Sequence, residues 1–260
     1  MHEIKEKLDE FQRLLEIMSE LRLKCPWDKE QTFESLRTLT IEETYELADA
    51  ILKDNKKEIS KELGDLLLHI VFYAEMGSES GDFDIFQVTK NLNEKLIYRH
   101  PHIFGDTVAS DSVKVMQNWE DLKLKEKGGN KTVLSGVPVS LPALIKAHRI
   151  QDKARSVGFD WEEREQVWDK IKEEFEELQT EIHCMDQDKI EAEFGDLFFS
   201  LINAARLYHV NPENALERTN RKFISRFNYL ESKTISMGKD LRKMSLAEMD
   251  EIWNEAKKSE

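Results

Sequence analysis

Acidic side chains recur at a fixed spacing in the second half of the chain. Glu174 and Glu177 are three positions apart, and so are Glu193 and Asp196. Residues with this spacing share one face of a helix, so two antiparallel helices joined by a short turn would bring four carboxylates together. Such a group repels itself unless cations compensate, and hard divalent ions such as Mg²⁺ or Mn²⁺ prefer oxygen ligands. The spacing therefore predicts a divalent metal site.

The same acidic pattern occurs a second time, 131 positions earlier. Residues 42–67 read EETYELADAILKDNKKEISKELGDLL, and residues 173–198 read EEFEELQTEIHCMDQDKIEAEFGDLF. The two segments align without a gap, and a merely solvated surface does not require the same acids in both. The alignment predicts two copies of one helical domain, with a second metal site in the first copy at Glu43, Glu46, Glu62 and Asp65.

Residues outside the acidic segments match as well. Pro26-Trp27-Asp28 corresponds to Gly158-Phe159-Asp160, and Trp119 followed by Lys123 corresponds to Trp253 followed by Lys257. In each segment a glycine stands next to the last acid, at Gly64 and Gly195, where the missing side chain would allow another helix to approach closely.

Basic side chains accompany the acids in the second copy. Lys222 and Arg226 share a helix face, Lys170 lies one turn before Glu174, and Lys189 lies one turn before Glu193. These cations are either solvated ion pairs or ligands for the phosphate oxygens of a polyphosphate. Trp253 either packs in the protein or stacks on a base or ribose.

The elements that must position these residues are expected to be helices. Gly and Pro together supply only 15 of the 260 residues, which removes many turn signals. Apolar periodicity predicts a first helix that ends before Pro26, a helix stop at Pro101, and several helices between them. Between these two prolines, helices are expected from Thr40 onward and over 57–76 and 84–99. A further helix is expected after Pro101, over 111–126.

Five glycines and prolines fall between Gly128 and Pro142. They predict a linker over 128–142, between an N-terminal domain over 1–127 and a C-terminal domain over 143–260.

Composition excludes several other classes of protein. A net charge of -14 argues against nucleic-acid and membrane partners, and two cysteines without a secretion signal fit a cytoplasmic protein. A di-iron centre would need His three residues after Glu, which the sequence lacks. The sequence also has no P-loop and no GxGxxG motif.

The doubled EExxE…ExxD pattern resembles the all-α nucleoside triphosphate pyrophosphohydrolases. With CPWDKEQTFESL, RHPHIF and VGFDW, the chain is similar to MazG proteins along nearly its whole length. The resemblance implies an intertwined homodimer of helical bundles with broad specificity for ribo- and deoxynucleoside triphosphates. The reaction would be Mg²⁺-dependent cleavage to the monophosphate and diphosphate, which clears the nucleotide pool.

The resemblance also implies roles for individual residues. It makes Glu174, Glu177, Glu193 and Asp196 the metal ligands. From the chemistry of the acids we predict that Glu173 and Glu174 are catalytic, with Glu173 or a neighbouring carboxylate orienting or deprotonating the attacking water. The resemblance places the nucleotide, ATP for example, against Lys170, Glu173, Glu174, Lys189, Ile190, Glu191, Ala192, Asp196, Lys222, Phe223, Ile224, Ser225, Arg226 and Trp253.

Two alternatives remain at this point. One is a narrow dUTP or phosphoribosyl-ATP pyrophosphatase, and the other is a non-catalytic acidic helical interaction protein. The copies also differ, because Leu39 and Glu58 stand in the first copy where Lys170 and Lys189 stand in the second. We therefore expect the second copy to be the principal catalytic site.

Overall fold

The computed structural model describes residues 2–105, 115, 122 and 132–258. Every regular element in these ranges is a helix, which confirms the all-α prediction. The chain divides into two compact units, Met1–Val108 and Ala109–Glu260. None of the described helices is long and apolar enough to cross a membrane.

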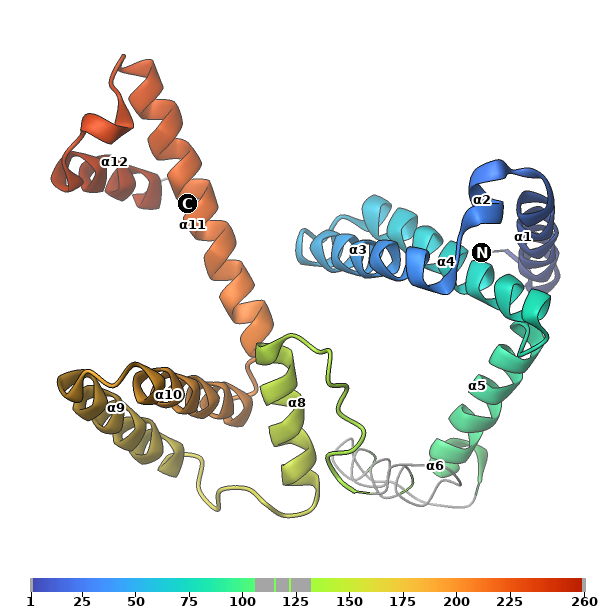
Figure 1. Cartoon of the computed structure of the whole chain (residues 1–260), viewed down its shortest axis with the longest axis horizontal. Helices are drawn as coiled ribbons and strands as arrows, with labels where there is room; N and C mark the ends of the chain where they lie inside the picture. Colours follow the sequence, from blue (N-terminus) through green and yellow to red (C-terminus); the bar gives the residue numbers. More distant parts are fainter. Residues whose placement is uncertain (1, 106–114, 116–121, 123–131, 259–260) are drawn as a thin grey trace. The chain divides into compact units, whose positions relative to one another are not determined.

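The first unit is built on a hairpin of two long helices, α3 (Phe33–Leu52) and α4 (Lys56–Ser80), which lie side by side (Figure 1). Two other helices pack on α4: α1 (Ile4–Lys24) and α5 (Ile85–Arg99). The short helices α2 (Pro26–Glu30) and α6 (Pro101–Phe104) follow α1 and α5. The predicted helix ends before Pro26 and Pro101 are confirmed, although in both places the proline begins a new short helix, as its fixed φ allows.

The core of the first unit lies where α1, α3 and α4 meet. Met18 of α1, Leu36 of α3 and Phe72 of α4 are almost fully buried, together with Val71 and Met76. Removal of this apolar surface from water is the main contribution to the stability of the unit. Three helices are therefore held by one cluster.

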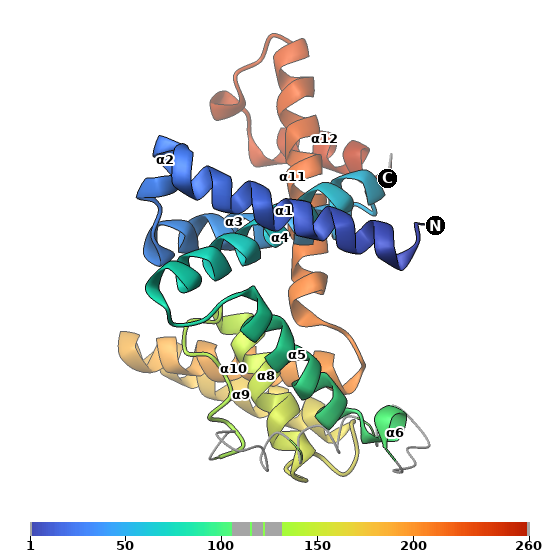
Figure 2. The same cartoon turned by 90° about the vertical axis from the view of Figure 1, so that its right-hand side faces the viewer.

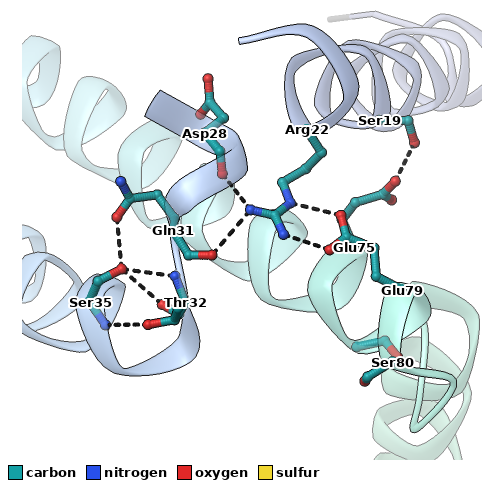
Figure 3. Close-up of polar contacts among 10 residues, drawn as sticks. Ser19, Arg22, Asp28, Gln31, Thr32, Ser35, Glu75, Glu79 and Ser80 are labelled. Carbon is teal, nitrogen blue, oxygen red and sulfur yellow. Dashed lines mark hydrogen bonds and ion pairs between the residues drawn. The ribbon is translucent and has the colours of Figure 1, made fainter. Parts of the chain in front are cut away.

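Arg22 joins α1 to both α2 and α4 (Figure 3). Its guanidinium binds the Glu79 carboxylate in a bidentate pair, with Nε to Oε1 at 2.7 Å and Nη2 to Oε2 at 2.5 Å. The same group donates to the main-chain carbonyls of Asp28 and Gln31 and lies over the Phe72 ring. The hydrogen bonds to Glu79 raise the pKa of Arg22. Arg22 thus fixes the turn between α1 and α3.

Two predicted helix boundaries in this unit are wrong. Helix α3 begins at Phe33 and not after Thr40, because Thr32 and Ser35 form a reciprocal capping box that starts the helix earlier. Helix α4 continues to Ser80 and ends at Gly81, whose φ of 73° is the left-handed conformation of a glycine C-cap. Apart from residues 115 and 122, the predicted helix over 111–126, with Trp119 and Lys123, lies outside the described residues.

The second unit repeats the long hairpin with α9 (Gln166–Cys184) and α10 (Gln187–Leu207) (Figure 2). Helix α8 (Ala143–Ser156) packs on α10 and on α11 (Pro212–Ser236). A 3-10 turn over Leu241–Lys243 then reverses the chain, and α12 (Leu246–Lys258) returns along α11. The described part of the predicted linker, residues 132–142, contains turns and no helix.

Candidate functional site

Three carboxylates meet on the hairpin of the second unit. Glu174 and Glu177 of α9 and Glu193 of α10 each offer an oxygen atom within 4.8 Å of the others. The reversal between the helices is tight, with Met185 at a φ of 60° and Asp186 as the N-cap of α10. The hairpin therefore brings together acids from two predicted helix faces.

The surroundings of these acids favour a cation. Glu174 is only 6% exposed, and Glu193 Oε2 is buried without a hydrogen-bond partner among the described residues. Burial raises the pKa of Glu193, and the charges of Glu177, Asp196 and Glu174 raise it further. An all-oxygen donor set with an unpartnered buried oxygen fits a hard divalent ion.

Asp196, the fourth predicted ligand, is outside this group of three. Its charge acts on Glu193, and its side chain lines the adjoining cavity. The structure thus places Asp196 beside the cluster, on the side where a ligand has room.

Lys170 lies on the carboxylates as a counterion. Its Nζ is 2.9 Å from Glu173 Oε1 and 2.7 Å from Glu174 Oε1. These hydrogen bonds, to Glu174 first and Glu173 second, raise the pKa of Lys170, so the ammonium keeps its charge. Lys170 also lines the cavity, where it can meet an anion.

The other predicted phosphate-binding cations lie elsewhere. Lys189 pairs with Glu181 at 3.6 Å and with Asp186 at 3.9 Å. It stands in the first turn of α10, followed by Ile190, Glu191 and Ala192, and none of these four residues lines the cavity.

The predicted contacts on α11 and α12 form a separate group. The Phe223 and Trp253 rings lie 5.0 Å apart, and the Arg226 guanidinium lies 5.9 Å from the centre of the Trp253 ring. Phe223 and Ile224 are exposed. Neither these residues nor Lys222 and Ser225 line the cavity.

A cavity of about 620 Å³ opens beside the carboxylates in the second unit. Its lining combines apolar and polar side chains from α8, α9, α10 and the segments before α8 and between α8 and α9: Leu134, Ile150, Gln151, Ala154, Gly158, Phe159, Asp160, Trp161, Val167, Lys170, Glu174, Asp196, Phe199, Ser200, Asn203 and Arg206. The repeated motif before α9 pointed to Phe159 and Asp160. Nothing in the spacing of Gln151, Asn203 and Arg206 singled them out.

The polar wall of the cavity is held by Arg206. Its guanidinium makes a bidentate pair with Asp160, with Nη1 3.0 Å from Oδ2 and Nη2 bonded to Oδ1. It also donates to Asn203 Oδ1 from Nε at 3.0 Å and from Nη2 at 2.8 Å. Burial works to raise the pKa of Asp160, but the hydrogen bonds from Arg206 and the Trp161 main chain lower it overall. Gln151, on α8, donates from Nε2 to the Phe199 carbonyl at 2.8 Å.

The first unit has its own carboxylate cluster, made by Glu43 of α3 with Glu62 and Asp65 of α4. Glu62 is 3% exposed, and burial together with the charges of Asp65, Glu46 and Glu62 raises the pKa of Glu43. Lys61 lies among these acids, with its Nζ 2.9 Å from Glu62 Oε1 and 3.7 Å from Asp65 Oδ2.

Glu46, the fourth acid predicted for this site, lies outside the group of three and lines a neighbouring acidic cavity of about 660 Å³. The expected close helix approach at the two repeated glycines is wrong within each unit. A Cβ built on Gly64 or Gly195 would meet nothing within 4 Å, so packing inside the unit does not require glycine there.

Comparison with known proteins agrees with this arrangement. The sequence model of the family described as MazG nucleotide pyrophosphohydrolase domain matches the chain twice, at residues 31–104 and 162–230. The two matches confirm the predicted tandem repeat, and each contains one long hairpin and its carboxylate cluster.

Similar proteins align along most of the chain. A Thermotoga maritima protein named nucleoside triphosphate pyrophosphohydrolase/pyrophosphatase MazG is 44% identical over 95% of each chain. An Escherichia coli K12 protein named nucleoside triphosphate pyrophosphohydrolase is 40% identical over 97% of this chain and 99% of its own. The Bacillus subtilis protein YabN is 44% identical over 96% of this chain and 52% of its own length. The chain therefore belongs to the MazG family of nucleotide pyrophosphohydrolase domains, which are hydrolases of acid anhydrides.

Proposed function

We propose that the second unit hydrolyses nucleoside triphosphates to the monophosphate and diphosphate, with Mg²⁺ or Mn²⁺ as cofactor. The observation that carries the proposal is the meeting of three carboxylates beside a cavity that Lys170 and aromatic side chains also line. A polyphosphate needs cations on its oxygens, and a nucleoside needs an enclosed, partly apolar space. The names of the relatives support the same reaction.

Glu174, Glu177, Glu193 and Asp196 would hold the metal. When bound, a divalent ion neutralises phosphate oxygens and activates water. Glu173, at the edge of the cluster, would accept the proton of the attacking water. Glu174 would act both as ligand and in fixing the position of Lys170.

Lys170 would exchange partners when the substrate binds. In the structure its ammonium neutralises Glu173 and Glu174, and a divalent ion would take over that task. The Lys170 Nζ then becomes available to donate to phosphate oxygens. This exchange leaves the carboxylates compensated in both states.

The predicted contacts that do not line the cavity need a second source. We propose that a second copy of the chain brings Lys222, Arg226 and Trp253 to the nucleotide in a homodimer. Exposed apolar residues on α9, α10 and α11 support the proposal, since such faces normally pack against a partner: Phe175, Phe194, Phe198, Leu201, Phe223 and Ile224. Residues 189–192 would contact the phosphates from the first turn of α10.

Product analysis tests this function. Purified protein with Mg²⁺ is incubated with ribo-, deoxy- and damaged nucleoside triphosphates, and the products are separated. The expected result is one monophosphate and one diphosphate from several bases, with no turnover in EDTA. Release of orthophosphate would contradict the reaction. Turnover of dUTP alone, or of phosphoribosyl-ATP alone, would favour the narrow alternative, and no turnover of any nucleotide would favour an interaction protein.

A further inference from the structure

The orientation of the Asn203 amide is set by its neighbours in the second unit. Arg206 Nε and Nη2 both donate to Asn203 Oδ1, at 3.0 and 2.8 Å. A guanidinium has donors and no acceptor, so only the amide oxygen, and not the amide nitrogen, can face it. Asn203 therefore turns its NH₂ group away from Arg206.

Arg206 cannot readily turn away from Asn203. Its side chain is 4% exposed and the Asp160 carboxylate binds it in a bidentate pair. Charge-assisted bidentate pairs are strong and geometrically specific. Asp160, Arg206 and Asn203 thus form a hydrogen-bonded series in which each group fixes the orientation of the next.

Asn203, the last group of this hydrogen-bonded series, lies at the cavity. Asn203 lines the cavity and is only partly buried, and its Nδ2 donates to no acceptor in the described part of the chain. Phe159, Trp161 and Phe199 line the same space, and flat apolar side chains suit the faces of a base. The cavity therefore offers a hydrogen-bond donor at a fixed place near apolar walls.

We infer that Asn203 is a specificity-determining residue that donates a hydrogen bond from Nδ2 to an acceptor on the nucleobase of the substrate. The acceptor is a ring nitrogen or a carbonyl oxygen. Asp160 and Arg206 are positioning residues that act through Asn203. This inference rests on the proposed function for the identity of the ligand and adds the residue that selects it.

The first unit does not have this arrangement of side chains. At the aligned positions it has Phe72 for Asn203 and Glu75 for Arg206. Phe72 is 2% exposed and belongs to the hydrophobic core. The donor is thus a property of the second unit.

The variant Asn203→Asp separates recognition from folding. An aspartate has the same shape and still accepts from Arg206, but it replaces the NH₂ donor by an acceptor. Binding of a nonhydrolysable α,β-methylene analogue of ATP with Mg²⁺ should weaken about 10- to 100-fold, and in turnover the KM should rise while kcat stays within about twofold. The melting temperature should not fall. The control Asn214→Asp, which changes an exposed residue of α11, should leave the binding of the analogue and the KM unchanged.

Two further ligands identify the contact. Inorganic tripolyphosphate has no nucleoside, so its binding should be the same in the wild type and Asn203→Asp; an equal weakening would mean that the added charge acts at a distance and would overturn the inference. Ribose 5′-triphosphate should also bind equally, whereas a weakening like that of the ATP analogue would assign the contact to the sugar and overturn it.

Failure of the inference differs from failure of the proposed function. Unchanged binding of the ATP analogue to Asn203→Asp overturns the role of Asn203 even if the wild-type protein hydrolyses ATP. Absence of hydrolysis with normal analogue binding contradicts the proposed function alone. Absence of nucleotide binding to the wild type contradicts both.

Discussion

Each unit has a carboxylate cluster on its long hairpin, and the two clusters differ mainly in what lies next to them. In the second unit Ser200 and Asn203 line a cavity. The aligned residues of the first unit are His69 and Phe72, both buried, with Phe72 in the core. The comparison shows that similar groups of acids have different neighbours, which are cavity-lining polar residues in the second unit and buried residues in the first.

The cations differ as well. The second unit has Lys170 on α9 at the margin of its acids, where the first has Leu39. The first unit has Lys61 on α4 within its acids, where the second has Ala192. Lys61 pairs with two acids of its cluster, whereas Lys170 pairs with one, Glu174, and with Glu173 outside the group of three, so Lys61 competes more directly with a metal ion.

The largest effect among the substitutions that transfer a difference between the units is expected from Asn203→Phe. It places the residue of the first unit in the cavity of the second and should lower kcat/KM for nucleoside triphosphates about 100-fold, because the displaced nucleoside misaligns its phosphates. Steady-state kinetics measure this. Affinity for Mn²⁺ should remain, since the carboxylates are untouched, and near-normal kcat/KM would show that the cavity is not the substrate site.

Lys170→Met should have the next largest effect. Loss of a charged donor to the phosphates should lower kcat/KM about 10- to 100-fold. The control is Lys243→Met, which removes an exposed lysine of the same unit and should leave kinetics unchanged. If both variants behave alike, Lys170 has no role beyond its ion pairs.

Lys61→Ala tests the competing cation of the first unit. Without its ammonium among Glu62 and Asp65, Mn²⁺ should bind the first cluster about fivefold more tightly, the scale of one partly exposed ion pair. Calorimetric titration in a Glu174→Gln, Glu193→Gln background reports the first cluster alone. The reciprocal change Ala192→Lys should weaken Mn²⁺ binding in the otherwise wild-type second unit. Tighter Mn²⁺ binding in that variant would contradict competition between the lysine and the metal ion.

Asp160→Asn should have the smallest effect on kcat at saturating substrate, within about twofold, and its main effect on stability. The pKa of Asp160 is lowered from 3.8 in the folded state, so its ionised form stabilises the fold fully above that value, and this contribution is lost as pH falls through the lower folded pKa. Breaking the pair with Arg206 should cost about 1.5–3 kcal/mol at neutral pH, the scale of hydrogen bonds to a charged group, because Asp160 is 20% exposed. Melting curves between neutral pH and about pH 2 should show a flatter acid loss in the variant. Asp28→Asn, at the aligned position of the first unit, should change the profile less, because Arg22 binds the main-chain carbonyl of Asp28.

Local spacing predicted much of this molecule. Apolar periodicity predicted the helices, and three-residue spacing placed Glu174 with Glu177 on one face, because both depend only on helix geometry. The start of α3 was missed because the capping box at Thr32 and Ser35 outweighs the apolar pattern that resumes after Thr40.

Local sequence patterns could not predict which residues line the cavity. Gln151 and Asn203 come from α8 and α10 and meet only through tertiary packing, which no spacing rule describes. The spacing of Lys189 from Glu193 left an ion pair and a phosphate contact open, and the folded chain shows ion pairs of Lys189 with Glu181 and Asp186. The available signals were the repeated Gly158-Phe159-Asp160 for Phe159 and the VGFDW motif for Phe159 and Trp161.

If catalysis belongs to the carboxylates of the second unit, paired Gln variants in the two units will have different effects on turnover. Glu174→Gln with Glu193→Gln removes two acids from the cluster beside the cavity, and Glu43→Gln with Glu62→Gln removes the aligned acids of the first unit. Diphosphate release with Mg²⁺ should be abolished in the first double variant and largely retained in the second. Equal losses in both double variants, or loss only in the second, would mean that the first unit shares or holds the catalytic site.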